Sequence, residues 1–260
     1  VFFPCEGRTI RRSSHALVSD RSDVDTDCNS AEDLFSAFAR GNETDVIVYA
    51  HCGGRYADIE LAHDGRFEKS MEIHSSWGTF EWLVHDAFRL GYRFGIVANS
   101  DGHKGRPGAS YPGASQFGAV GGLTCFLINE LTRESVLDCM RKRHHYATTG
   151  GENGRPLINL HTSFTSPGRI YHDDPNLFDT SYIEASSALM GDIVHLPDGE
   201  MELCIEINCN VPIERIDIFN GLEKLETIKP YKQDELGNRI RIIWEEQNTG
   251  VALEKSYGMV

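Results

Sequence analysis

The sequence predicts an α/β domain over residues 1–155, followed by a smaller, β-rich, sandwich-like domain over residues 156–260. In the first part, short apolar runs alternate with amphipathic segments, as they do in β/α units around a parallel sheet. In the second part, polar and apolar residues alternate with period two between turn-like Asn-Gly and Leu-Gly-Asn sequences, which is typical of antiparallel strands. The 260 residues are enough for each part to bury a core of its own.

Three helices are predicted in the first part from caps and helical spacing. Asn29-Ser30 offers an N-cap to the first helix, Thr79 to the second and Thr132 to the third. The predicted helices therefore cover residues 31–40, 80–90 and 133–143. The predicted strands of the first part are residues 1–4, 15–18, 45–50, 70–73, 93–98 and 123–128. Those of the second part are residues 201–207, 213–219, 225–228 and 239–244.

The charge balance bears on the partner of the protein. A formal net charge of −14 argues against nucleic acid as the main partner, because binding to a phosphate backbone usually depends on clustered Lys and Arg. Bound divalent metals would cancel part of this charge locally, so a small anionic substrate stays compatible with it. No apolar run is long enough to span a bilayer.

The cysteines and the N-terminus bear on the compartment. Seven cysteines without a CxxC pair favour free thiols in a reducing, cytoplasmic compartment over a disulfide scaffold. The first residues, VFFPCEGR, lack the zones of a signal peptide. They have the pattern of the end of a barrel strand, so we expect an upstream part of the protein, which leaves a periplasmic location open.

The sharpest local signal is the motif NSDGHKGRPG at residues 99–108. Asp101 and His103 lie two apart at a predicted strand end, so both side chains project from the same side and can reach one group of metals. Gly102 would let the backbone turn sharply between them. Taken alone, the tripeptide fits a Gly-rich surface loop equally well.

Other candidate ligands fall at the ends of predicted strands. Glu6, His51 and His74 follow strands, and His15 starts one. The strands of a parallel barrel would bring such residues together at one mouth, where they could share metals. Surface or core positions are expected for the isolated His63, His85, His161 and His195. A favourable interaction with the dipole at a helix C-terminus is expected for His144 and His145.

Four stretches carry a resemblance to a known family: SSWGTFEW, VANSDGHKGRPGASYPGA, FGAVGGLT and KRHHYATTG. With them, residues 50–150 resemble the polymerase-and-histidinol-phosphatase (PHP) superfamily of metallohydrolases, and look like its bacterial DUF3604 group, related to the carbaryl-hydrolase-like members. The resemblance covers about the first 155 residues. It implies a distorted, TIM-like (β/α)7 barrel, incomplete here because the family's opening His-x-His pair is absent from this chain. It also implies divalent metal ions (Zn, Mn or Fe), up to three in the complete protein.

The resemblance further implies a set of metal ligands. Glu6 would be the carboxylate that bridges two metals, and His15 and His51 would bind the second metal. Asp101 would bind the first metal and His103 the third. The resembling group usually has Gly-Asp shortly before the position of His15, whereas this chain has two serines there, which puts His15 in more doubt than His51.

The chemistry that follows is hydrolysis by a metal-bound hydroxide, with no protein nucleophile. Asp101 and His103 would act with Lys104 and Arg106, which would hold an anionic substrate or stabilise the developing oxygen charge. Lys104 and Arg106 fit solvated loop cations equally well. Glu72 and His74, at a strand end, are expected to support the ligands or contact the substrate, with direct ligation by His74 a weaker alternative.

Three functions stay open on the sequence. A metal-dependent phosphoesterase that acts on a small molecule is the first. A carboxylic or carbamate ester hydrolase of the same fold is the close alternative, because the same hydroxide serves both substrates. A catalytically inactive binding or accessory module, with the β-rich part contacting a polymer or partner, is the alternative from another class.

Overall fold

The computed structural model describes residues 1–51, 57–106, 120–149 and 154–236. It divides the chain into two compact units, Val1–Pro212 with Gly221–Glu223 and Ile213–Asn220 with Lys224–Val260. The predicted domain boundary between residues 155 and 156 was placed where the sequence pattern changes from β/α units to alternating strands, and it stays a prediction. Every site discussed below lies in the first unit.

The first unit contains a small sheet whose central strand is β2 (Glu68–Ser75). β1 (Val48–Ala50) and β4 (Gly95–Ala98) both pair with β2 in parallel. β3 (Gly78–Thr79) pairs with the end of β2 in antiparallel. Because β1, β2 and β4 run in the same direction, their carboxyl ends lie at one edge of the sheet.

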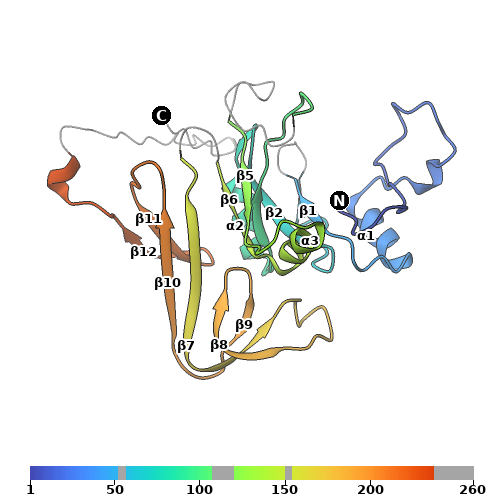
Figure 1. Cartoon of the computed structure of the whole chain (residues 1–260). Helices are drawn as coiled ribbons and strands as arrows, with labels where there is room; N and C mark the ends of the chain where they lie inside the picture. Colours follow the sequence, from blue (N-terminus) through green and yellow to red (C-terminus); the bar gives the residue numbers. More distant parts are fainter. Residues whose placement is uncertain (52–56, 107–119, 150–153, 237–260) are drawn as a thin grey trace, which may run out of the picture. The chain divides into compact units, whose positions relative to one another are not determined.

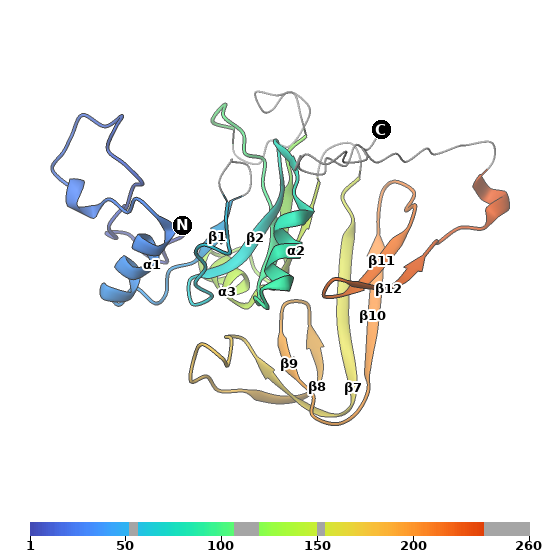
Figure 2. The same cartoon turned by 180° about the vertical axis from the view of Figure 1, so that it is seen from behind.

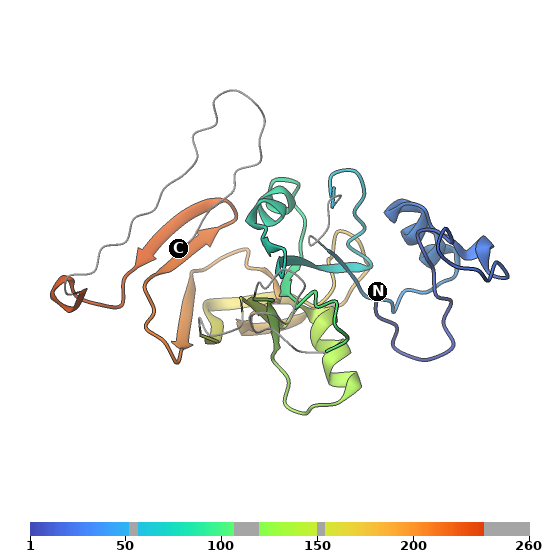
Figure 3. The same cartoon turned by 90° about the horizontal axis from the view of Figure 1, so that it is seen from above.

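α2 (Glu81–Arg89) and α3 (Arg133–Lys142) lie on opposite faces of this sheet, as Figure 1 and the views from behind in Figure 2 and from above in Figure 3 show. Met71 of β2 packs with buried residues of α2. Successive strand residues point to opposite faces, and the neighbouring Ser70 hydroxyl accordingly contacts His145, 3.0 Å from its Nε2. The sheet is therefore buried on both sides.

α1 (Ala31–Arg40) begins at the predicted cap. The Ser30 side chain accepts from the backbone N–H of Asp33, and the Asp33 side chain accepts from the backbone N–H of Ser30, which forms a capping box. Phe35 and Phe38 of this helix are buried in a cluster with residues at and before the start of β1. A short 3-10 helix, η1 (Val24–Thr26), precedes α1.

β5 (Leu123–Phe126) and β6 (His145–Thr148) form a separate antiparallel pair. The Tyr146 hydroxyl joins this pair to the next part of the chain. It donates to the carbonyl of Pro156 at 3.0 Å and accepts from the backbone N–H of Ile158 at 3.1 Å. The start of the following strand is thus held beside β6.

β7 (Leu157–Tyr171) is the longest strand and the centre of a four-stranded antiparallel sheet. Its partners are β8 (Ile183–Leu189), β9 (Ile193–His195) and β10 (Met201–Asn208). Phe164, Ile170 and Ala188 form the buried core of this sheet. Among the described residues, the second unit contains strand β11 (Ile216–Asn220), which pairs with β12 (Glu223–Ile228), and the 3-10 helix η3 (Gln233–Leu236).

This architecture contradicts the predicted TIM-like (β/α)7 barrel with a sandwich-like domain. A barrel requires each strand to pair with the next around a closed ring. In the described part of the chain, only β1, β2 and β4 are parallel, whereas β5 turns back to pair with β6. The β-rich part is antiparallel, but its strands form one four-stranded sheet and a separate two-stranded sheet. The fold is strand-rich, with several small sheets and three α-helices in the described ranges.

Several predicted elements are corrected by local contacts. The helix predicted after Thr79 begins at Phe80 as N-cap, because the Thr79 hydroxyl bonds to His74 instead. The strand predicted at residues 15–18 is a turn, closed by a hydrogen bond from the N–H of Val18 to the carbonyl of His15 at 3.0 Å. The strand predicted at residues 239–244 lies outside the described residues. Within the described ranges, no helix combines the length and apolarity needed to cross a bilayer.

Candidate functional site

Three strands of the parallel sheet bring polar side chains to one edge. His51 follows β1, Glu72 lies near the end of β2, and Asn99 and Asp101 follow β4. The carboxyl edge of a parallel sheet is where ligand sites usually form. We call these four residues the strand-end cluster.

Glu72 orients the imidazole of His51. His51 Nδ1 lies 2.5 Å from Glu72 Oε2, and Asn99 Nδ2 donates to Glu72 Oε1 at 2.7 Å. Both oxygens of a side chain whose residue is only 2% exposed are therefore occupied. The hydrogen bond to Glu72 raises the pKa of His51. It also leaves Nε2, the other ring nitrogen, as the atom that can bind a ligand.

The Asp101 carboxylate faces this second nitrogen. Asp101 Oδ2 lies 3.8 Å from His51 Nε2, and this oxygen is buried without a hydrogen bond to any described residue. The Asp101 backbone is left-handed, with a φ of 47°, and its carbonyl accepts from Ser76 Oγ at 3.3 Å. A strained backbone and an unsatisfied carboxylate oxygen both cost free energy, and such features concentrate at functional sites.

An apolar cavity of about 680 Å³ adjoins the strand-end cluster. Tyr49 and Asn99 line it from the side of the cluster. Burial, together with the charge of Glu72, raises the pKa of Tyr49 to about 12, so its phenol stays protonated at neutral pH. The remaining lining is mostly apolar: Phe2, Phe3, Leu123, Phe126, Leu131, Val136, Leu137 and Met140. The cavity can therefore hold an apolar group next to an acidic edge.

Both ring nitrogens of His74 form hydrogen bonds, one to a side chain and one to the backbone. Its Nε2 donates to the carbonyl of Val120 at 3.1 Å, and its Nδ1 accepts from the Thr79 hydroxyl at 2.8 Å. Burial lowers the pKa of His74, which favours the neutral ring. The carbonyl of His74 also accepts from the N–H of Asn99 at 3.1 Å. His74 thus connects the end of β2 to a member of the strand-end cluster.

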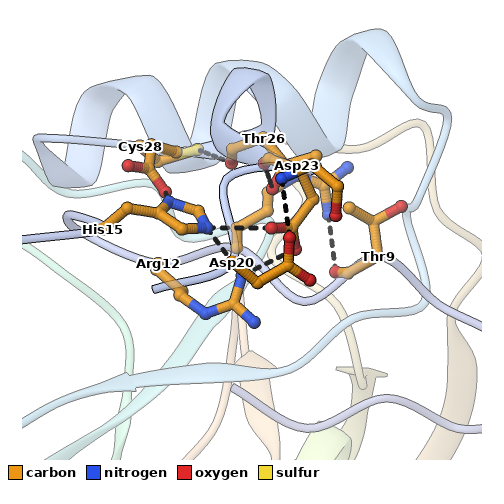
Figure 4. Close-up of polar contacts among 10 residues, drawn as sticks. Thr9, Arg12, His15, Asp20, Asp23, Thr26 and Cys28 are labelled. Atoms are coloured by element: carbon orange, nitrogen blue, oxygen red, sulfur yellow. Dashed lines mark hydrogen bonds and ion pairs between the residues drawn. The ribbon is translucent and has the colours of Figure 1, made fainter. Parts of the chain in front are cut away.

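His15 lies in a different polar cluster, within the N-terminal segment (Figure 4). Its Nδ1 lies 2.5 Å from Asp27 Oδ1, and its Nε2 lies 2.8 Å from Asp23 Oδ1. Arg12 Nη1 lies 3.3 Å from the same Nε2. The residue is 1% exposed. Because both nitrogens are occupied by carboxylates, the structure places His15 with these residues rather than with His51.

The other predicted site residues are exposed. Glu6 lies in the N-terminal segment, and His103, Lys104 and Arg106 lie on the loop that follows Asp101. Of the predicted metal ligands, the structure therefore brings His51 and Asp101 together, with the predicted supporting residue Glu72. It does not bring Glu6 or His15 to them.

Two members of the site were not predicted. Asn99 stands directly after a buried strand, and this position is the same signal that identified His51, so the sequence could have indicated it. Tyr49 lies within an apolar strand, and the sequence carries no separate signal for its contact with the polar edge.

Comparison with known proteins finds a relative with partial coverage. An uncharacterized protein of Chlamydia pneumoniae is 30% identical over 120 residues, a match that covers 38% of this chain and 18% of that protein. The chain thus spans about a fifth of the length of this relative. No family model matches the sequence. No solved structure matches it.

Proposed function

We propose that this protein is a metal-dependent hydrolase of phosphoesters and that the strand-end cluster binds its divalent metal, which is zinc, manganese or iron. The observation that carries the proposal is the chain of contacts from Glu72 through His51 to Asp101. Metal-binding histidines usually donate their second ring nitrogen to a carboxylate or carbonyl, and His51 has this arrangement with Glu72. The resemblance of residues 50–150 to PHP metallohydrolases points to the same chemistry.

Two donor atoms of the cluster lie at a distance that fits one metal ion. Zinc lies ~2.0–2.2 Å from nitrogen and oxygen ligands, so two donors of one ion are at most about 4.4 Å apart. His51 Nε2 and Asp101 Oδ2, at 3.8 Å, satisfy this limit. A cation between them would also supply the partner that Asp101 Oδ2 lacks among the described residues.

A bound divalent metal would lower the pKa of a coordinated water and polarise the ester. The residues of the chain do the positioning. Glu72 holds the His51 ring in place. Tyr49, with a pKa of about 12, stays a hydrogen-bond donor beside the cavity. Lys104 and Arg106, exposed on the adjoining loop, carry positive charge for an anionic substrate.

The apolar cavity favours a second candidate function, the hydrolysis of carboxylic or carbamate esters. An aryl or alkyl group of such an ester would fit a space lined mostly by aromatic and aliphatic side chains. The activated water would serve a carbonyl centre as well as a phosphorus centre. The two candidates therefore share one metal site and differ in the substrate group that it acts on.

The test combines metal analysis with a substrate screen on the purified protein. We expect aryl phosphate mono- or diesters to be hydrolysed, with activity lost on chelation and restored by zinc, manganese or iron. The change His51→Ala should weaken metal retention while the circular dichroism spectrum stays native. Glu72→Gln should lower metal affinity by about 10–100-fold, the usual effect of losing a partner that orients a ligand.

His85, exposed on α2, provides the matched control. His85→Ala should leave both metal content and activity unchanged. Hydrolysis confined to aryl carboxylic or carbamate esters would select the second candidate. Activity that survives both chelation and His51→Ala would exclude the proposed site.

A further inference from the structure

We propose that His144, His172 and Asp192 form a second metal site, distinct from the strand-end cluster, that takes a zinc-class divalent ion. One ligand atom from each of these residues, which we call the His144 cluster, lies within 4.8 Å of the other two. Within the described ranges, no other trio of His, Cys, Asp or Glu meets this condition. The residues come from three segments, after α3, after β7 and before β9.

The ligand atoms converge on one carboxylate oxygen. His144 Nε2 lies 2.8 Å from Asp192 Oδ1, and His172 Nδ1 lies 3.4 Å from the same oxygen. His172 Nδ1 is buried and makes no hydrogen bond within the described part of the chain. In a tetrahedral zinc site, donor atoms lie about 3.4 Å apart. Only a small movement of His144 would therefore open a position for the ion.

The backbone around the cluster is already fixed. The guanidinium of Arg143 donates to the carbonyl of His172 at 2.7 Å and to the carbonyl of Gly191 at 3.1 Å. Asp192 Oδ2 accepts from the N–H of Leu189 at 2.9 Å, which directs Oδ1 toward the imidazoles. The segments that carry His172 and Asp192 are thus held by hydrogen bonds that do not use the proposed ligand atoms. Such support around a site reduces the ordering that binding requires.

The donor set selects the class of ion. Two imidazole nitrogens and one carboxylate oxygen suit zinc and its neighbours, whereas calcium and magnesium favour oxygen ligands alone. Three protein ligands leave a fourth position for water. The side chain of His172 is 35% exposed, against 7% for Asp192, so solvent reaches this edge of the cluster.

The test uses cobalt as a spectroscopic substitute for zinc, in protein that carries Asp101→Asn to remove the strand-end metal. We expect this protein to bind one equivalent of cobalt, with the visible absorption of a tetrahedral ion. Adding His172→Gln should weaken that binding at least ~10-fold. His195→Gln, an exposed histidine on β9, is the matched control and should leave the titration unchanged.

Cobalt binding that is unaffected by His172→Gln would overturn the proposal, as would no binding to natively folded Asp101→Asn protein. If His172→Gln does not fold, Asp192→Asn, which keeps hydrogen-bonding groups in place, is expected to show the same loss of cobalt. Ester hydrolysis is not the readout, so failure of this site and failure of the strand-end site are distinguished.

Discussion

The strand-end cluster and the His144 cluster use the same types of side chain in two different surroundings. At the sheet edge, the His51 side chain is 54% exposed and faces an unsatisfied carboxylate held by a strained backbone. In the His144 cluster, the Asp192 side chain is 7% exposed, and the ligands come from segments that Arg143 already holds together. The first arrangement suits a site that meets substrate, whereas the second suits an ion-binding site whose surroundings need little reordering when the ion binds.

The largest expected effect is a loss of ester hydrolysis, and it should follow from a change in the strand-end cluster. Asp101→Asn keeps the size of the side chain but removes its charge, so we expect ester hydrolysis to fall by about 10³-fold, beyond the effect of losing an orienting partner. The free energy of unfolding should not fall, since the buried oxygen has no hydrogen bond to a described residue. Steady-state kinetics and urea denaturation measure both. Asp138→Asn, a helix carboxylate, is the control, and equal loss in the two variants would contradict the assignment.

Gly191→Ala should break the His144 cluster alone. Gly191 has a φ of +95°, and an added Cβ would lie 2.2 Å from the carbonyl oxygen of Arg143. We expect unfolding to become about 2–3 kcal/mol easier in urea, with hydrolysis per folded molecule unchanged. Gly91, with a φ of +74° and open space around it, is the matched control. Gly91→Ala should show only the backbone cost, about 1 kcal/mol.

His145, a buried neighbour of the His144 cluster, should make the free energy of unfolding depend on pH even when no metal is bound. Burial lowers the pKa of His145 to about 4, although the hydrogen bond to the carbonyl of Ile96 acts in the opposite direction. The unfolded chain binds a proton below its ordinary pKa of about 6.5, so this stability is full above pH 6.5 and is lost as pH falls toward 4. At pH 5 the loss should be about 2 kcal/mol.

Urea denaturation in the presence of a chelator measures this loss. His145→Gln can replace both hydrogen bonds but does not titrate, so its free energy of unfolding should change less between pH 7 and pH 5. Equal slopes for the two proteins would assign the pH dependence to other groups.

The smallest effect concerns the ion pairs around the His144 cluster. Arg93 Nη1 lies 2.5 Å from Asp174 Oδ1, but the Arg93 side chain is 41% exposed. Exposed pairs contribute ~0–1 kcal/mol, so Arg93→Gln should change stability by about 0.5 kcal/mol and leave cobalt binding intact. Arg89→Gln, at the more exposed pair with Glu60, should do even less. A loss of several kcal/mol would show that ion pairs, rather than the histidines, hold this region.

Local signals in the sequence succeeded where the structure depends on neighbours in the chain. The caps Ser30 and Thr132 correctly placed α1 and α3, because capping involves residues three apart. Strand-end positions likewise predicted that His51 and Asp101 lie at one edge of the sheet, whereas their role as metal ligands stays a prediction. The prediction of a barrel was wrong because long-range packing decides which strands pair, as when β5 pairs with β6. The sequence predicted that His144 interacts with the C-terminus of its own helix. Its partner Asp192 lies in a turn far along the chain, so the local sequence carries no signal for this contact.

β7 is held at its two ends by unrelated contacts. Tyr146 of β6 bonds to the backbone at its start, and Arg143, between α3 and β6, donates to the carbonyl of His172 directly after its last residue. The antiparallel sheet therefore cannot separate from the segment 143–146 at either end of β7 without breaking a polar contact. The β5–β6 pair and the sheet around β7 have no strand pairing with each other, but these contacts couple them. We therefore expect the first unit to unfold in one cooperative transition rather than in two steps.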